Sequence, residues 1–186
     1  YLFLSFGMII LGQLFSKNSE VDVFIFTIIL LIGGLPHGAL DFYILKNIFK
    51  MKTFIFSLIV YLFIAASFYL LFFLFPEFIF TLFLIYSAFH FGDSDFRDDS
   101  RISKLAWGSM IVCIPLLIDS NNAEWFLNIF LNNLISLNSN YLIAIIAFSL
   151  ILNLYSRKNS LLKILLLFVY ITTCLFSNIF YGFAAY

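Results

Sequence analysis

The chain has 186 residues, of which 63% are hydrophobic, 21% aromatic and only 11% charged. A soluble domain of this size needs far less apolar surface, so the composition indicates a membrane protein. The formal net charge is zero and no basic stripe is present, which excludes a nucleic-acid partner. Cys113 and Cys174 both lie in apolar runs, where we expect packed thiols rather than a disulfide framework.

Runs of apolar residues follow one another along the chain and predict helices that cross a lipid bilayer. They cover residues 1–15, 23–45, 53–75, 78–91, 105–118, 141–154 and 161–176, and another begins at 179. A crossing takes roughly 20 apolar residues, so the sequence predicts an all-α fold, a polytopic transmembrane helical bundle of about seven to eight spans. We expect residues 1–186 to form a single transmembrane domain, truncated at both ends because an apolar run already starts at Tyr1 and another stops at Tyr186.

The segment 123–137 is less apolar than the runs, since it is rich in Asn and carries Glu124 and Trp125. Whether it crosses the membrane decides which side the later connections face. Nine of the ten basic residues gather in three connections: Lys46, Lys50 and Lys52; Arg97, Arg101 and Lys104; Arg157, Lys158 and Lys163. If the segment does not cross the membrane, all three connections face the cytoplasm, as the positive-inside rule requires. We therefore predict one interfacial helix at 123–137 on the outer side, with Trp125 as an interface anchor, in a multi-pass protein of the cell inner (cytoplasmic) membrane.

The segment 33–41, Gly-Gly-Leu-Pro-His-Gly-Ala-Leu-Asp, places polar groups at the end of the second run. Ionisable groups at membrane depth are costly and usually face a bundle interior or a cavity. His37 and Asp41 are four residues apart, so they share one helix face if the helix resumes after Pro36. A kinked span with a structural histidine is the simpler alternative, and the cost of buried polar groups favours a functional role.

His90 opens a similar motif, His-Phe-Gly-Asp-Ser-Asp, at the end of the fourth run. In the predicted orientation His37 and His90 lie about 21 Å and about 18 Å down a hydrocarbon core roughly 30 Å thick. Histidine is the commonest metal ligand, and a carboxylate often accepts its second ring N–H. We therefore predict that His37 and His90 bind one metal ion, with Asp41, Asp93 and Asp95 as candidates to orient the imidazoles.

Two histidines do not complete a catalytic metal site, because three or more protein ligands are usual. Either carboxylates complete the set, or further ligands follow Tyr186, where the last run would reach the same depth after about another turn or two. For Asp98 and Asp99 we expect only a hydrated cytoplasmic loop, since charges near the ends of spans are usually solvated.

Two motifs carry a resemblance to a known family. Residues 34–41, Gly-Leu-Pro-His-Gly-Ala-Leu-Asp, and residues 89–95, Phe-His-Phe-Gly-Asp-Ser-Asp, resemble the Brp/Blh family of bacterial and archaeal membrane β-carotene 15,15′-dioxygenases. The first motif is quite specific, and the second is specific in combination with it. The multi-helix layout and the closing residues 181–186 also resemble the family, whose further His-Ser motif would follow just after Tyr186.

The resemblance implies a concrete reaction. With dioxygen and non-haem Fe²⁺, held by histidines that include His37 and His90, the protein would cleave the central double bond of β-carotene to two molecules of retinal, which the family makes for microbial rhodopsins. No catalytic residue beyond the metal ligands is implied. The long, uncharged substrate dissolves in the lipid bilayer, which suits an apolar tunnel that opens to lipid.

Other classes of protein compete with this interpretation. A membrane transporter or channel would use His37 and Asp41 as an ion or proton path, and broken helices with polar groups near the midplane fit that class. The absence of an internal repeat argues against it. Membrane di-iron hydroxylases normally carry many clustered histidines, whereas this chain has two isolated ones. A purely structural subunit would leave both histidine motifs unexplained.

Overall fold

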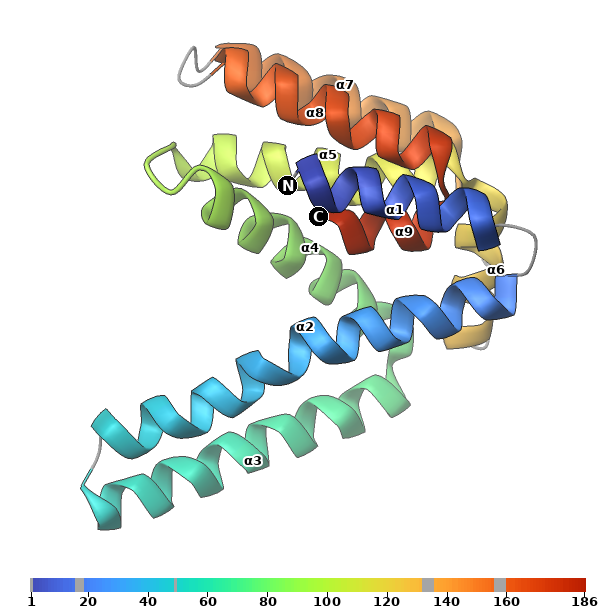
Figure 1. Cartoon of the computed structure of the whole chain (residues 1–186). Coiled ribbons are helices and arrows are strands. Elements are labelled where there is room, and N and C mark those ends of the chain that lie inside the picture. Colours follow the sequence, from blue (N-terminus) through green and yellow to red (C-terminus); the bar gives the residue numbers. More distant parts are fainter. Residues whose placement is uncertain (1, 16–18, 49, 132–135, 156–159) are drawn as a thin grey trace. The chain divides into compact units, whose positions relative to one another are not determined.

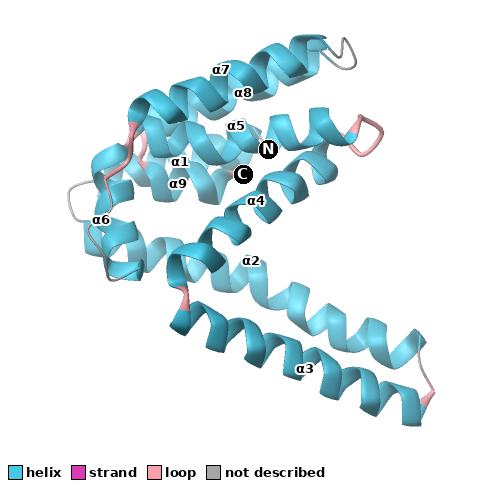
Figure 2. Cartoon of the chain, turned by 180° about the vertical axis from the view of Figure 1, so that it is seen from behind, coloured by secondary structure: helices cyan, strands magenta, loops and turns pink. Residues whose placement is uncertain are grey.

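The computed structural model describes residues 2–15, 19–48, 50–131, 136–155 and 160–186, leaving the side chains of 2, 15, 19, 30, 33–41, 51, 52 and 130 undescribed. Within these ranges helices are joined by short loops and no strand occurs (Figure 2), which confirms the all-α prediction for this part of the chain. The helices shown in Figure 1 are α1 (Leu2–Phe15), α2 (Ser19–Ile48), α3 (Met51–Leu74), α4 (Pro76–Asp95), α5 (Arg101–Ile118), α6 (Ser120–Leu131), α7 (Ser139–Tyr155), α8 (Ser160–Phe176) and α9 (Ile179–Ala185).

Two of the described helices are both long and apolar enough to cross a bilayer, namely α3 over Thr53–Leu74 and α5 over Arg101–Ile118. Shorter apolar helices occupy Phe3–Leu14, Ser139–Tyr155 and Ser160–Phe176, and the last two have 17 residues each. At 1.5 Å per residue such a helix rises about 26 Å, somewhat less than a hydrocarbon core of roughly 30 Å. The described helices thus support association with a membrane, and the number of spans stays a prediction.

Local residue choices set several helix boundaries. α3 ends at Leu74 and α4 begins at Pro76, because proline disfavours a helical residue before it and suits the first helical position. Ser100 caps α5, since its hydroxyl accepts a hydrogen bond from the Ser103 N–H at 3.2 Å. The turn between α4 and α5, which directly follows the second histidine motif, therefore ends at the capping residue Ser100.

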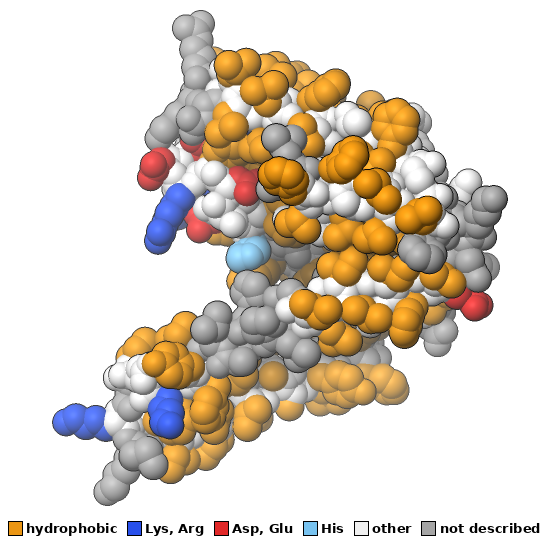
Figure 3. All heavy atoms as spheres, in the orientation of Figure 1, with side chains coloured by type: hydrophobic (Ala, Val, Ile, Leu, Met, Phe, Trp, Pro, Cys, Tyr) orange, Lys and Arg blue, Asp and Glu red, His pale blue; other side chains and the backbone are white. Residues whose placement is uncertain are grey.

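The chain divides into two compact units, one formed by Tyr1–Val23 and Leu82–Tyr186 and the other by Phe24–Thr81. The second unit contains the α2–α3 hairpin, where the rings of Phe42 and Phe54 pack edge to face with centroids 5.4 Å apart. Most large apolar side chains of α3 are exposed, and Figure 3 shows hydrophobic side chains spread over this hairpin. A helix that is apolar on all sides suits contact with lipid. The single-domain expectation stays a prediction.

The first unit is built around α5, most of whose residues are buried. This helix contacts α6, α7, α8 and α9. The core cluster consists of Phe96, Trp107, Met110, Ile111, Ile114, Tyr170 and Cys174. The hydroxyl of Tyr170 donates to the Ile111 carbonyl oxygen at 2.9 Å, so the buried phenol is satisfied. Cys113 and Cys174 are buried free thiols, as predicted.

The N-terminus of α9 is anchored by buried polar side chains. Asn178 caps this helix, because its Oδ1 accepts hydrogen bonds from the backbone N–H groups of Phe180 and Tyr181. Its Nδ2 donates to Asp22 Oδ2 at 2.7 Å, and the Tyr181 hydroxyl donates to Asp22 Oδ1 at 3.0 Å. Burial raises the pKa of Asp22, against the lowering effect of these two hydrogen bonds. The first residues of α2 are thereby tied to the end of the chain.

The segment 123–137, predicted as an interfacial helix, overlaps α6 (Ser120–Leu131), which begins three residues earlier. Its 12 residues rise about 18 Å, which is too short to cross a bilayer. The helix does not reach the predicted end, since residues 136 and 137 are not helical. Glu124 on α6 accepts a hydrogen bond from the Leu137 N–H at 2.7 Å, so the chain after α6 returns to the helix. Trp125 is partly buried, and its role as an outer anchor stays a prediction.

Candidate functional site

The first predicted motif lies on α2, which runs as one helix from Ser19 to Ile48. The backbone stays helical through Pro36, so His37 and Asp41 are four residues apart on a continuous helix. The side chains of residues 33–41 lie outside the described part of the chain. The roles of His37 as a metal ligand and of Asp41 as its partner therefore stay predictions.

His90 lies on the exposed side of α4, within the first unit. Its ring is nearly parallel to the ring of Tyr86 one turn earlier, with an interplanar angle of 10° and centroids 6.2 Å apart. The Phe91 ring has the same centroid distance and is tilted by 51°. Among the described residues, no carboxylate hydrogen-bonds to the imidazole. His90 is thus an exposed nitrogen donor with aromatic rings beside it and the Asp93 carboxylate within electrostatic range.

The carboxylates that follow His90 contact α5. Asp93 Oδ1 accepts a hydrogen bond from Lys104 Nζ at 2.6 Å, and this hydrogen bond lowers the pKa of Asp93. Asp95 Oδ2 accepts a hydrogen bond from Trp107 Nε1 at 2.7 Å. Both residues were predicted to orient an imidazole. The structure gives each a described partner on α5, Asp93 also lies within electrostatic range of His90, and the predicted role of both stays a prediction.

The backbones of α4 and α5 contact each other at two points, Ala88 and Gly92 of α4, which flank His90 in the sequence. Gly92 faces Lys104, and Ala88 faces Gly108 of α5. A Cβ atom added to Gly92 would lie 1.9 Å from the carbonyl oxygen of Lys104, and one added to Gly108 would lie 1.6 Å from the carbonyl oxygen of Ala88. Real Cβ atoms essentially never approach closer than 3.0 Å, so neither position has room for a side chain. The depth and rotation of the His90 turn are therefore set by direct backbone contact.

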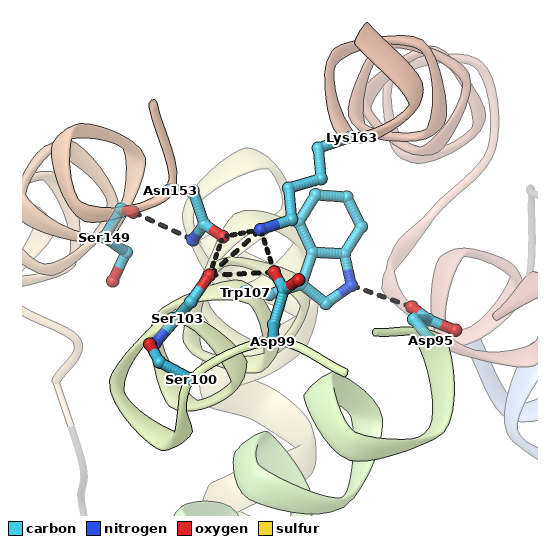
Figure 4. A network of polar contacts seen from close by, with 8 residues as sticks. All are labelled: Asp95, Asp99, Ser100, Ser103, Trp107, Ser149, Asn153 and Lys163. Atoms are coloured by element: carbon cyan, nitrogen blue, oxygen red, sulfur yellow. Dashed lines mark hydrogen bonds and ion pairs between the residues drawn. The ribbon is translucent and has the colours of Figure 1, made fainter. Parts of the chain in front are cut away.

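A buried polar network follows the motif, and here the prediction for Asp99 was wrong (Figure 4). Asp98 is exposed, but Asp99 is 9% exposed and its Oδ2 pairs with Lys163 Nζ at 2.5 Å. The lysine also donates to Ser103 Oγ and Asn153 Oδ1, both at 2.9 Å. The Asp99 carboxylate is buried, and the ammonium group of Lys163 on α8 compensates the charge at its Oδ2.

The same network joins the α4–α5 turn to three helices. The Ser103 hydroxyl donates to Asp99 Oδ2 at 3.1 Å, and Asn153 Nδ2 donates to the Ser149 carbonyl oxygen at 3.0 Å (Figure 4). The Lys163 ammonium also lies 4.9 Å from the centroid of the Phe96 ring. α5, α7 and α8 are thereby fixed around the turn that follows His90.

Sequence reasoning missed the residues that hold this end of the motif in place. Lys163 and Asn153 are isolated polar residues at the edges of apolar runs, which was the available signal for a buried role. Trp107 carried no such signal, because an indole in an apolar run is ordinarily a packing residue. Lys104 and Lys163 were assigned to connections that face the cytoplasm, and the structure shows both buried in ion pairs.

The described side chains include one predicted metal ligand, His90. No group of three or more His, Cys, Asp or Glu side chains suited to a metal occurs among them, and the side chain of His37 lies outside the described part of the chain. The exposed His90 imidazole, which lies within electrostatic range of Asp93 and hydrogen-bonds to no described carboxylate, is a suitable donor for a divalent transition metal. The residues that the structure describes thus fit one ligand of the predicted ion, and the ligand set stays a prediction.

Comparisons with known proteins point to one kind of enzyme. The family model described as beta-carotene 15,15′-dioxygenase matches residues 27–186. A beta-carotene 15,15′-dioxygenase from the uncultured marine bacterium 66A03 is 35% identical over 95 residues. That match covers 45% of this chain and 34% of the relative, so the chain spans about a third of the length of the curated relative it matches. No solved structure matches the chain significantly.

Proposed function

The chain belongs to the beta-carotene 15,15′-dioxygenase family, and we propose that this protein cleaves the central double bond of β-carotene with dioxygen to give two molecules of retinal. The membership confirms the resemblance predicted from the two histidine motifs, both of which lie within the matched residues. The structural observation that best supports the proposal is the exposed His90 imidazole, which contacts the rings of Tyr86 and Phe91.

The proposal includes non-haem Fe²⁺ as cofactor, with His37 and His90 among its ligands. When bound, the ion would supply the redox chemistry that allows dioxygen to react with a carbon–carbon double bond. α4 would present His90 from a turn fixed by backbone contact at Gly92 and Gly108. Asp41, four residues after His37 on α2, is the candidate to orient that imidazole.

The substrate would reach the site from lipid. Next to His90 on α4, the large side chains of Phe83, Tyr86 and Phe89 are exposed, and they offer aromatic surface to a long polyene. These rings would hold the chain of double bonds in place and keep water away from it. Each oxygen atom of dioxygen ends in one of the two aldehyde products, so the reaction needs no external reductant.

The membrane setting completes the proposal. The protein would be a multi-pass protein of the cell inner membrane, with about seven to eight spans if the apolar runs cross as predicted. The three basic connections would face the cytoplasm. Retinal would leave into the lipid bilayer and pass to a microbial rhodopsin. The apolar helices α3 and α5 support the membrane location.

Retinal formation in cells that already make β-carotene tests this function. The complete protein is expressed in such a bacterial host, and retinal and residual β-carotene are measured by chromatography. We expect the unaltered protein to form retinal, and His37→Ala and His90→Ala to abolish it while their amounts in the membrane fraction stay unchanged. Thr81→Ala, on the exposed surface of α4, is the matched control and should remain active.

The outcomes separate the protein's function from the role of each histidine. Intact β-carotene with the unaltered protein present in the membrane would reject the proposed reaction. Normal retinal yield from His90→Ala would remove His90 from the site while leaving the reaction in place. Iron analysis of the purified proteins should show less bound iron in both histidine variants than in Thr81→Ala.

A further inference from the structure

The second histidine motif contains a carboxylate whose partner lies away from the histidine. We propose that Asp95, Trp107 and Tyr186, here named the indole clamp, position the end of α4 that carries His90. This inference rests on the proposed function, because positioning matters only if His90 acts in the reaction. It assigns Asp95 to an indole N–H instead of to a metal ion or an imidazole.

The clamp is built on one shared donor. Trp107 Nε1 lies 2.7 Å from Asp95 Oδ2 and 2.9 Å from the hydroxyl oxygen of Tyr186. Trp107 is 1% exposed, so water does not replace either acceptor. A buried N–H that lost both partners would carry its full desolvation cost. The indole therefore connects the last residue of α4 to residue 186 through α5.

Aromatic packing connects the same residues to the histidine. The ring of Tyr186 packs edge to face against Phe91, with centroids 5.3 Å apart, and against Tyr170 on α8 at 5.2 Å. Phe91 directly follows His90 on α4. A shift of Tyr186 or Trp107 would therefore move the turn that carries the imidazole, through Phe91 and Asp95.

The chemistry of the donor distinguishes positioning from a direct role at the metal. A neutral indole N–H needs an acceptor but no negative charge, so the amide oxygen of asparagine can replace the carboxylate of Asp95. A metal ligand needs the carboxylate charge, and loss of a group that orients a ligand typically costs about 10- to 100-fold in metal affinity or activity. Asp95→Asn should thus keep the activity that Asp95→Ala loses only if Asp95 acts as an acceptor in the indole clamp.

Steady-state kinetics of the complete protein provides the first test. Asp95→Ala and Trp107→Phe should each lower kcat for retinal formation roughly tenfold or more, because small displacements of a reacting group are costly, with KM for β-carotene unchanged. The double variant should be no worse than either single variant. Asp95→Asn should keep activity close to that of the unaltered protein. Asp98→Ala and Trp125→Phe serve as matched controls and should behave normally.

Opposite outcomes would overturn the inference. If Asp95→Asn is as inactive as Asp95→Ala while Trp107→Phe is normal, Asp95 acts at the metal site itself. If the losses in the double variant multiply, the two side chains do not act through one hydrogen bond. Should Trp107→Phe fail to fold, Tyr186→Phe takes its place, because it keeps the ring and removes only the hydroxyl group.

An NMR signal tests the clamp without activity. In protein labelled with ¹⁵N-tryptophan, the indole N–H signal that disappears in Trp107→Phe belongs to Trp107. It should shift in Asp95→Ala and in Tyr186→Phe and stay in place in Asp98→Ala. An unshifted signal in the first two variants overturns the clamp, whether or not the protein forms retinal. If the signals shift and the unaltered protein forms no retinal, the proposed function fails instead.

Discussion

Gly108→Ala is the sharpest test of how α4 is held. The added Cβ would lie 1.6 Å from the Ala88 carbonyl oxygen, whereas at least 3.0 Å is needed, so the shortfall is about 1.4 Å. The obstructing atom is backbone and cannot rotate away. The two helices must therefore separate or slide at the point where Ala88 lies two residues before His90.

The expected cost follows from that displacement. Forcing extra atoms into a packed interface typically costs about 1–3 kcal/mol, occasionally more. For a chain of this size each kcal/mol lowers the melting temperature by about 2–4 °C, so Gly108→Ala should lower it by roughly 2–12 °C. A displacement of about 1 Å at a reacting group can cost about a hundredfold in rate. The rate of retinal formation should therefore fall strongly at temperatures where the Gly108→Ala protein is still folded.

Gly7→Ala is the matched control, because a Cβ added to Gly7 meets no atom within 4 Å. There the better helix propensity of alanine should raise stability by up to about 1 kcal/mol. The two substitutions are chemically identical, and their effects on the melting temperature of the detergent-solubilised protein should have opposite signs. If Gly108→Ala melts at or above the temperature of the unaltered protein, the close backbone contact between α4 and α5 is refuted.

Three further predictions concern stability in detergent. Lys163→Met should lower the free energy of unfolding by about 3–5 kcal/mol, because it leaves the Asp99 carboxylate buried without its cation. The double variant Lys163→Met with Asp99→Leu should recover most of that loss, as measured by thermal melts. Burial raises the pKa of Asp22 in the folded protein above its ordinary value of 3.8. The protonated carboxyl therefore favours the folded state. Its contribution to the free energy of unfolding is fully present below pH 3.8 and is lost as the pH rises through the folded-state pKa. Asp22→Asn should flatten that part of the melting profile, and an unchanged profile would contradict the assignment. Ser100→Ala should cost about 1 kcal/mol by removing the α5 cap, and denaturant titration would measure it.

The helices could be predicted because an apolar run has few alternatives. A backbone placed in lipid would have to satisfy its own hydrogen bonds, which is why we predicted helices from the runs at 1–15 and 161–176. The structure has α1 and α8 there. The boundaries were less predictable. α4 continues past the end of its run at residue 91 to Asp95, because polar side chains in its last turn bind α5 instead of ending the helix.

The burial of Asp99 was out of reach of local pattern. An aspartate in the run Arg-Asp-Asp-Ser is ordinarily hydrated. Asp99 can be buried because Lys163, 64 residues later in the chain, forms an ion pair with it. Pairings over such distances depend on how helices pack, and residue spacing does not encode that. The pairing of His37 with His90 is a prediction of the same kind, and it stays one.

The distribution of partners around the second motif bears on the choice of metal ligands. Asp93 is paired with Lys104, Asp95 accepts from Trp107, and Asp99 is paired with Lys163. If Asp93 or Asp99 left its lysine for a metal ion, a buried cation would lose its carboxylate at a cost of several kcal/mol. If Asp95 left, the Trp107 N–H would keep only the Tyr186 hydroxyl as its described acceptor. The His90 imidazole is exposed and, among the described residues, makes no hydrogen bond that it would have to give up, although Asp93 lies within electrostatic range. The energetic balance therefore favours imidazole donors over these carboxylates, in keeping with the proposed histidine-held ion.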